Sequence, residues 1–242
     1  MEKEIVNVLC MKWGTKYPAD YVNKLYSMVA RNMSRPFRFI CLTEDGVGTY
    51  ENVEVFPLPE LSVDLAGPER GWNKLAVFAE TLYDLKGKVL CLDLDLIITG
   101  SLDDLFDYPG EVMIIKDWIK KDGTGNSSVY RFEVGAHPEI LSEFEKSFQQ
   151  IKNTHRNEQE YLSAALMAKN ALVYWPDEWC RSFKRHCLKP FWFLIARETQ
   201  VPENARVIVF HGKPDPHEAI AGGRGKWYRR FKPATWITDH WR

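Results

Sequence analysis

In the N-terminal part of the chain, short continuous apolar runs alternate with segments in which apolar residues recur every three or four positions. Four runs rich in Val, Ile, Leu and Phe predict strands at residues 5–10, 37–42, 53–56 and 88–92. Apolar side chains recur at helical spacing over residues 22–29 and 72–83, which predicts two amphipathic helices. This order of elements favours an α/β fold with a Rossmann-like, mostly parallel central sheet and helices on both faces.

The C-terminal part continues this pattern less regularly. Further strands are expected at residues 112–115, 128–132, 172–175 and 206–210, and further helices at residues 141–151 and 158–169. We see no internal repeat and no interdomain linker in the 242 residues. We therefore expect a single domain over residues 1–220, with residues 221–242 as a tail packed on or beside it.

Composition narrows the class of protein. Hydrophobic residues make up 45% of the chain and charged residues 27%, with a net charge of −1. These values exclude intrinsic disorder, and the balanced charge argues against a nucleic-acid partner. No stretch reaches the roughly 18 apolar residues of a membrane span, and the charged start of the chain is not typical of a signal peptide. We expect a cytoplasmic protein with reduced cysteines, with peripheral attachment to a membrane as the alternative.

Ligands of parallel α/β sheets bind at the carboxyl ends of the strands. Three segments follow predicted strands of this sheet directly, namely Lys12–Tyr17, Thr43–Asp45 and Asp93–Asp95. We therefore expect these segments to meet in space, although they are far apart in the sequence.

Two carboxylates stand in an otherwise apolar run, Leu92-Asp93-Leu94-Asp95-Leu96. Burying two ionised groups without a compensating charge is very costly, so both side chains should emerge at a strand end and face a cation. Oxygen ligands of this kind suit Mg²⁺ or Mn²⁺. The alternative is a strand-end turn whose two acids are simply solvated.

A histidine and a lysine follow the last predicted strand. The segment Phe210-His211-Gly212-Lys213-Pro214 places an imidazole where it can bind a metal at the edge of the sheet. Gly212 allows the backbone to approach a ligand closely, and Lys213 can reach a phosphate. By itself the segment is more typical of a structural histidine, but together with the two aspartates it favours a metal site.

This set of residues resembles the GT-A nucleotide-sugar glycosyltransferases, and within them the glycogenin and bacterial galactosyltransferase group. The resemblance implies that Asp93, Asp95 and His211 hold Mn²⁺, or Mg²⁺, on the diphosphate of a nucleotide-sugar, and that Lys213 contacts the phosphates. It extends over nearly the whole chain, to about Pro216. The chain therefore looks like a hexosyltransferase with a single GT-A domain.

Further segments carry the same resemblance. It implies that Lys74 contacts the diphosphate or the sugar, that Asn126 and Ser127 line the donor-sugar pocket, and that Glu158 and Gln159 lie at the reaction centre. The chain departs from the family pattern at three positions, Ser128, Glu158 and Asp215. These departures affect the choice of sugar and the stereochemical outcome more than the fold.

The nucleotide base should lie over the end of the first strand. Lys12, Trp13 and Tyr17 are candidates for stacking on the base, which is uracil or guanine, with uracil preferred. Asp45 is a candidate for a hydrogen bond to the base or the ribose. The alternative for Trp13 and Tyr17 is a role as loop anchors.

The stereochemical outcome depends on which group faces the acceptor. The resemblance favours retention of the anomeric configuration, with Gln159 beside the anomeric carbon. Inversion would instead need a carboxylate as general base, for which Asp177 and Glu178 are the candidates. The acceptor, a glycan or a lipid-linked glycan, is not specified by the sequence.

Two other classes of function use similar residues. Paired acids also serve nucleotidyltransferases and other metal-dependent phosphoryl enzymes, but these favour a Gly-rich loop after the first strand, where this chain has only Gly14. A non-catalytic nucleotide-sugar-binding module with a degenerate site is the third hypothesis. Turnover of a nucleotide-sugar with Mn²⁺ distinguishes the three.

Overall fold

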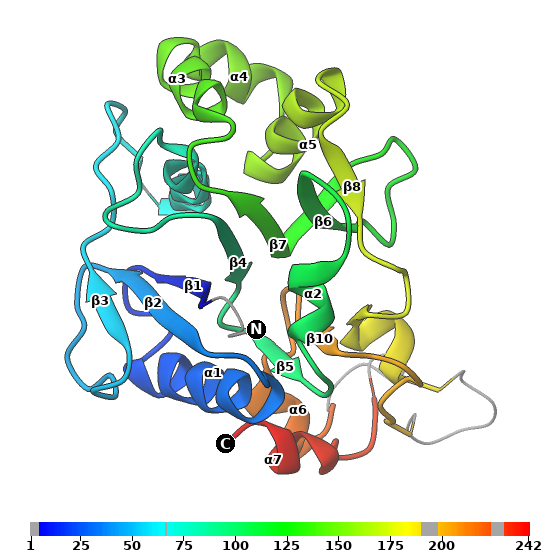
Figure 1. Ribbon diagram of the computed structural model, residues 1–242. Helices are drawn as coiled ribbons and strands as arrows, with labels where there is room; N and C mark the ends of the chain where they lie inside the picture. Colours follow the sequence, from blue (N-terminus) through cyan, green and yellow to red (C-terminus); the bar gives the residue numbers. More distant parts are fainter. Residues whose placement is uncertain (1–4, 66, 190–197, 224–229) are drawn as a thin grey trace.

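Seven strands form the central sheet of this computed structural model, which describes residues 5–65, 67–189, 198–223 and 230–242 (Figure 1). In spatial order the strands are β3 (Glu54–Phe56), β2 (Phe37–Thr43), β1 (Val6–Lys12), β4 (Lys88–Leu92), β7 (Gly125–Glu133), β6 (Val112–Lys116) and β8 (Leu172–Tyr174). Strands β3, β2, β1 and β4 run parallel, and β6 pairs in parallel with β8. Only β7 is antiparallel to its neighbours. The predicted mostly parallel sheet is confirmed.

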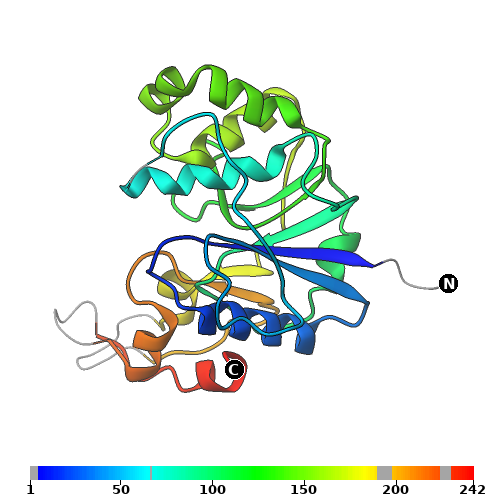
Figure 2. The same cartoon turned by 90° about the vertical axis from the view of Figure 1, so that its left-hand side faces the viewer.

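Helices cover both faces of this sheet (Figures 1 and 2). On one face lies α1 (Ala19–Asn32). Val22, Leu25 and Val29, which belong to its predicted apolar face, are fully buried. The short α2 (Asp103–Asp107) packs into the same part of the core as α1. On the opposite face lie η1 (Gly67–Phe78), α3 (Pro138–Lys146), α4 (Phe148–Thr154) and α5 (Glu158–Ala168).

The predicted helix over residues 72–83 differs from the structure in type and extent. The segment is a 3₁₀ helix, η1, that begins earlier and ends at Phe78. Its apolar side chains Trp72, Leu75 and Phe78 are buried against the sheet as the pattern predicted. Leu82 is also buried, but it lies in the turn that leads into β4, so the apolar pattern extends past the end of the helix.

A second, three-stranded sheet holds the C-terminal part of the described chain. It contains β5 (Leu96–Ile98), β10 (Val207–Val209) and β9 (Cys180–Ser182), with β10 antiparallel to β5 and parallel to β9. The turn Phe183–Cys187 follows β9, and α6 (Pro216–Ala221) follows β10. Because β4 and β5 lie in different sheets, the short link between them, Asp93–Asp95, is at the junction of the two sheets.

The end of the chain packs on α1. Helix α7 (Trp236–His240) is held there by Arg31, whose guanidinium donates to the carbonyl oxygens of His240 and Arg242 at 2.5 and 2.6 Å. The ring of Trp241 meets Tyr21 edge-on, with ring centroids 5.0 Å apart. Of the predicted tail, the structure describes residues 221–223 and 230–242, and these contacts hold α7 and Trp241 against α1.

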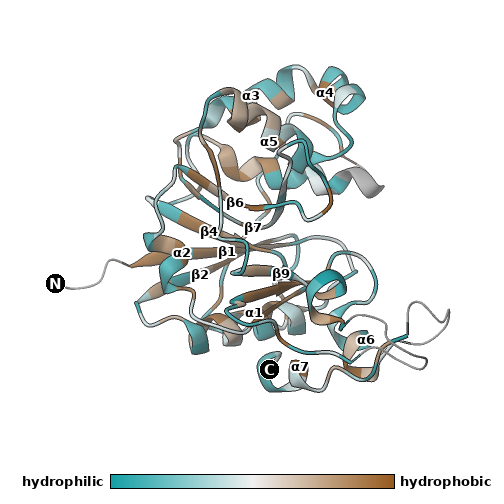
Figure 3. Ribbon diagram, turned by 90° about the vertical axis from the view of Figure 1, so that its right-hand side faces the viewer, coloured by the Kyte–Doolittle hydropathy of each residue, from teal (hydrophilic) through white to brown (hydrophobic). Residues whose placement is uncertain are grey.

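Hydrophobic residues concentrate on the central strands, and polar residues on the outer helix surfaces (Figure 3). The core is divided between the two faces of the large sheet, with α1 and the small sheet on one side and η1, α3 and α5 on the other. Among the helices that the structure describes, none combines the length and the hydrophobicity that crossing a bilayer requires.

Candidate functional site

The segments that follow β1, β2 and β4 meet at one end of the sheet, as their positions at carboxyl ends predicted. The ammonium group of Lys12 donates to the carbonyl oxygen of Asp45 at 3.0 Å. The hydroxyl of Tyr17 donates to Oδ2 of Asp95 at 2.8 Å. Lys12 and Asp45, and likewise Tyr17 and Asp95, are therefore in direct contact at this edge, although they are far apart in the sequence.

A cavity of about 270 Å³ opens at this meeting point. Most of its lining consists of residues that the sequence predicted for the site, namely Lys12, Trp13, Tyr17, Lys74, Asp93, Asp95 and Glu158, joined by Met11, Lys16, Gly71 and Leu94. A concave site with a few converging polar and charged groups is the usual form of a ligand-binding site.

Lys74 lies against the first of the two aspartates. Its Nζ is 2.5 Å from Oδ1 of Asp93, and it donates to the carbonyl oxygen of Ser127 at 3.3 Å. Burial lowers the pKa of Lys74, but the negative charges of Asp93 and Glu158 outweigh burial and leave that pKa raised. Lys74 therefore stays a cation inside the cavity.

Glu158 and Gln159 form the first turn of α5, and the Asn157 side chain caps this helix by accepting from the backbone N–H of Glu160 at 3.1 Å. Both side chains reach Ser127. The Ser127 hydroxyl donates to Oε1 of Glu158 at 3.0 Å, and the Ser127 backbone N–H donates to Oε1 of Gln159 at 3.1 Å. Ser127, which we predicted to line the donor-sugar pocket, is thus hydrogen-bonded to Glu158 and Gln159, which we predicted for the reaction centre.

The pKa of Asp95 is shifted at this site. Burial, and then the negative charge of Asp93, raise the pKa of Asp95 to about 6, while the hydrogen bond from Tyr17 opposes this rise. The charge of Asp95 is therefore not fully compensated, whereas the neighbouring Asp93 is paired with Lys74. Such an uncompensated carboxylate favours a cation as its partner.

His211 follows β10 and is anchored beside Asp95 by the backbone, because the N–H of Phe210 donates to the carbonyl oxygen of Asp95 at 3.0 Å. Its imidazole Nε2 lies 2.6 Å from the Ser182 hydroxyl and stacks on Trp118 with ring centroids 5.5 Å apart. Burial, followed by the positive charge of Lys184, lowers the pKa of His211, which favours the neutral imidazole that binds metals.

Within the described residues, no three His, Cys, Asp or Glu side chains stand close enough together to hold a metal ion. The imidazole of His211 points to Ser182 rather than to the aspartates. The shared metal site of Asp93, Asp95 and His211 therefore stays a prediction. Its donor set, two carboxylates and a neutral imidazole at the ends of adjoining strands, fits Mn²⁺ or Mg²⁺ chemically.

The remaining predicted residues lie around the cavity or outside its lining. The ammonium of Lys213 is held by Asp215 and Glu218 at 2.7 and 2.8 Å. The carboxylate of Asp45 accepts from the backbone N–H of Val47 at 2.9 Å, so one of its oxygens is used in its own turn.

Asn126 is buried, and its Oδ1 accepts from the backbone N–H of Ser128 at 3.1 Å. Asp177 is exposed and Glu178 is half-buried, and neither lines the cavity.

The sequence did not point to several residues of this region. Three such residues surround His211: Trp118 lies after β6, Ser182 is the last residue of β9, and Lys184 lies in the turn after β9. Trp118 lies two residues beyond the end of β6. It could have been predicted from the rule that ligands bind at the carboxyl ends of strands. Nothing in the sequence pairs the strands 180–182 and 207–209, so Ser182 and Lys184 had no such signal.

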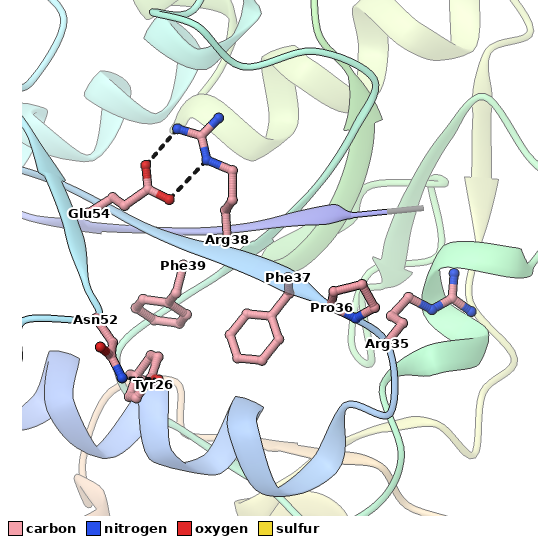
Figure 4. Close-up of a pocket in the computed structure, with 8 residues that line it drawn as sticks. All are labelled: Tyr26, Arg35, Pro36, Phe37, Arg38, Phe39, Asn52 and Glu54. Carbon is pink, nitrogen blue, oxygen red and sulfur yellow. Dashed lines mark hydrogen bonds and ion pairs between the residues drawn. The ribbon is translucent and has the colours of Figure 1, made fainter. Parts of the chain in front are cut away.

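A larger cavity, of about 450 Å³, lies at the other end of β2 (Figure 4). Its two arginines are already paired: Arg38 makes two hydrogen bonds to Glu54, at 2.9 and 2.6 Å, and Arg35 contacts Asp103 at 3.2 Å. It contains none of the residues predicted for the site. The smaller cavity at the carboxyl ends is therefore the candidate site.

Comparison with solved structures identifies the fold. The crystal structure of the galactosyltransferase LgtC with donor and acceptor sugar analogues is similar at a TM-score of 0.66 and 16% identity, covering 97% of this chain and 94% of LgtC. The chain has the GT-A fold of glycosyltransferases.

Two further solved structures are similar to this chain at lower TM-scores. Mouse xyloside xylosyltransferase 1 has a TM-score of 0.53 and 13% identity, covering 74% of this chain and 88% of that protein. An LgtC variant whose active-site glutamine is replaced by glutamate has a TM-score of 0.59 and 15% identity, covering 87% and 89%. No family model matches the sequence, and no curated protein matches it.

Proposed function

We propose that this protein is a metal-dependent glycosyltransferase that moves a hexose from a nucleotide diphosphate, UDP by preference, to an acceptor hydroxyl with retention of configuration. The observation that carries this proposal is the cavity at the carboxyl ends of β1 and β4, lined by Lys74, Asp93, Asp95 and Glu158. The cavity belongs to a fold shared with LgtC, which was crystallised with donor and acceptor sugar analogues.

Asp93, Asp95 and His211 are the residues that would hold the metal. A divalent cation would supply a positive charge that stabilises the departing diphosphate. The raised pKa of Asp95 supports this assignment, because a cation would remove the repulsion between the two neighbouring carboxylates.

The nucleotide would lie at the end of β1. Trp13 and Tyr17 line the cavity on this side and offer rings to the base, while Lys12 is fixed by the carbonyl oxygen of Asp45. The ammonium of Lys74, held between Asp93 and the Ser127 carbonyl, would face the diphosphate or the sugar and bind it by a charge-assisted hydrogen bond.

Gln159 and Glu158 would lie beside the anomeric carbon. Support comes from their hydrogen bonds to Ser127 on the predicted donor-sugar strand, and from LgtC, where an active-site glutamine has been the target of substitution. Retention is favoured over inversion because Asp177 and Glu178, the candidate general bases, lie outside the lining of the cavity. Product anomericity, read by NMR, decides between the two outcomes.

The reaction would take place in the cytoplasm, on a glycan or a lipid-linked acceptor. All five cysteines are free and buried, which is consistent with a reducing compartment.

The proposal is tested by a panel of nucleotide-sugars. Hydrolysis of each donor and its effect on the melting temperature are measured with Mn²⁺ and with EDTA. We expect one UDP-sugar to stabilise the protein and to be turned over only with the metal. Stabilisation by nucleoside triphosphates, with release of pyrophosphate, would instead identify a nucleotidyltransferase. Binding of a donor without any turnover in the presence of acceptor glycans would identify a binding module.

A further inference from the structure

The first residues of β2 have an open edge. Strand β3 pairs with β2 only from Ile40, which lies opposite Glu54. On the other side of β2, the N–H of Val6 donates to the carbonyl oxygen of Pro36 at 3.2 Å. Because the backbone groups of successive residues in a strand point alternately to its two sides, the N–H and the carbonyl of Phe37 point to the side that β3 leaves open. Within the described chain, no strand pairs with Phe37 on that side.

The cavity of about 450 Å³ lies along this open edge, at the end of β2 away from the candidate site. Its volume falls in the range of small-molecule sites. The side chains of Phe37 and Phe39 lie on one side of β2, and Arg38 with Glu54 lies on the other (Figure 4). The cavity therefore offers an aromatic side and a polar side to a single ligand.

The aromatic side is a row of three rings. The ring of Tyr26 lies 6.2 Å from that of Phe37 and 6.3 Å from that of Tyr50, measured between centroids. Tyr26 and Phe37 are half-buried and Tyr50 is exposed, whereas Phe39 is buried behind them. Accessible rings of this kind bind flat apolar surface, and the C–H face of a pyranose ring is such a surface.

The polar side carries donors and acceptors in fixed positions. Arg38 donates twice to Glu54, and its Nη2 also donates to Asp84 at 3.0 Å. The amide of Asn52 donates to the hydroxyl of Tyr26 at 3.0 Å, which ties the polar groups to the row of rings. A guanidinium, a carboxylate, an amide and a hydroxyl together can both donate to and accept from the hydroxyl groups of a ligand.

The charges around this cavity favour an uncharged ligand. Arg35 is paired with Asp103 and Asp107, at 3.2 and 2.5 Å, as Arg38 is with its own two carboxylates. The carboxylates outnumber the guanidinium groups, so they would repel a phosphate or another anion. A cation would gain little, because guanidinium groups already bridge the same carboxylates.

We propose that this cavity is an accessory binding site for an uncharged oligosaccharide. Its sugar rings stack on Phe37 and Tyr26, and its hydroxyl groups bond to Asn52, to the ion pair of the polar side and to the open backbone groups of Phe37. The length of β2, seven residues or about 20 Å, separates this cavity from the candidate site. The inference goes beyond the proposed function, since a glycan held here takes no part in the transfer.

The test measures oligosaccharide binding without turnover. Three neutral tetrasaccharides, maltotetraose, cellotetraose and lacto-N-neotetraose, are titrated with EDTA and no nucleotide, and saturation-transfer NMR gives each dissociation constant. The anionic probe is 3′-sialyllactose. The proteins are the wild type, Phe37→Ala and Asn52→Ala, and the matched control is Tyr83→Ala. Tyr83 is a partly exposed ring that stacks on Phe56 outside the lining of the cavity. Circular dichroism and the melting temperature confirm that each variant is folded.

We expect at least one neutral tetrasaccharide to bind the wild type, and to bind more tightly than the anionic probe. Its affinity should fall by roughly 10-fold in Phe37→Ala and by about threefold or more in Asn52→Ala, and stay within about twofold in Tyr83→Ala. Asn52 is exposed, so its replacement tests the site even where loss of the Phe37 ring disturbs the fold. Saturating UDP with Mn²⁺ should leave the affinity unchanged.

Two results would overturn this inference and leave the proposed function standing. One is a wild type that binds none of the neutral probes, or binds them equally well in the folded Phe37→Ala and Asn52→Ala variants. The other is binding that appears only with UDP and Mn²⁺, which would place the glycan in the candidate site. Tetrasaccharide binding that depends on Phe37 and Asn52, in a protein that turns over no nucleotide-sugar, would support this inference and overturn the proposed function.

Discussion

The hydroxyl of Tyr17 donates a 2.8 Å hydrogen bond to Oδ2 of Asp95, which joins the loop after β1 to the link between β4 and β5. The sequence suggested the ring of Tyr17 as a stacking partner for the base, and its hydroxyl in addition orients Asp95, a predicted metal ligand. A hydrogen bond to a metal-binding side chain fixes the orientation of that side chain and tunes its affinity for the metal.

Tyr17→Phe should therefore weaken Mn²⁺ binding by about 10-fold or more while the fold is kept, because Asp95 loses its orienting donor. Mn²⁺ binding is measured by electron paramagnetic resonance in the absence of nucleotide. Tyr21→Phe is the control, since the Tyr21 ring lies 4.7 Å from that of Tyr17 but its hydroxyl contacts His217. Equal loss in both variants would show that packing, rather than the bond to Asp95, supports the metal.

Lys74 should matter for stability as well as for donor binding. Lys74→Met removes the cation that pairs with Asp93 and attracts Glu158, and we expect the free energy of unfolding to fall by about 1–3 kcal/mol. Urea denaturation measures this change. Adding Asp93→Asn should restore most of the stability but none of the turnover. A double variant as unstable as Lys74→Met would mean that lost packing, not unpaired charge, is the cause.

Asp95 should destabilise the metal-free protein at neutral pH. Its folded pKa of about 6 lies above that of an unfolded aspartate, so the penalty is absent at low pH, grows as pH rises from about 4, and is complete above about pH 6. Asp95→Asn should accordingly be more stable than the wild type by about 1–2 kcal/mol at pH 7.5, and equal to it at pH 3.5.

Melting temperatures across this pH range, recorded with EDTA, measure the difference. Addition of Mn²⁺ should stabilise the wild type and not the variant. A variant that is less stable than the wild type at pH 7.5 would contradict the pKa shift.

Much of the fold could be predicted from the local pattern, because the spacing of apolar residues indicates buried strands and the buried faces of helices. The central parallel strands and the meeting of the Lys12 and Asp95 segments followed from this pattern and from the rule for carboxyl ends. The 3₁₀ form of η1 did not, since apolar spacing over a short segment does not distinguish it from an α-helix.

The surroundings of His211 could not be predicted, because they depend on long-range pairing. Strand β10 joins β5 and β9, which lie more than one hundred residues and about twenty-five residues away, and this pairing brings Ser182 and Lys184 to the imidazole. Similarly, the contacts of Lys213 with Asp215 and Glu218 arise from the start of α6, a helix too short to show a clear period.

Gln159 should act on the rate more than on donor binding. Gln159→Ala removes the acceptor of the Ser127 N–H and the amide beside the proposed reacting carbon, so we expect kcat to fall by about 10- to 100-fold with KM changed by less than about threefold. Steady-state kinetics with the preferred donor measure both constants. Gln150→Ala, on α4, is the control substitution. A raised KM with unchanged kcat would place Gln159 in ground-state binding alone.

The central claim is that Asp93 and Asp95 serve a metal-dependent transfer from a nucleotide diphosphate. The most direct measurement is the rate of nucleoside diphosphate release from the preferred nucleotide-sugar, titrated with Mn²⁺, for the wild type and for Asp95→Asn. We predict a wild-type rate that depends on Mn²⁺, is lost with EDTA, and falls about 100-fold or more in the folded variant. A wild-type rate that is unaffected by EDTA, or an Asp95→Asn variant that keeps full Mn²⁺-dependent turnover, would contradict the claim.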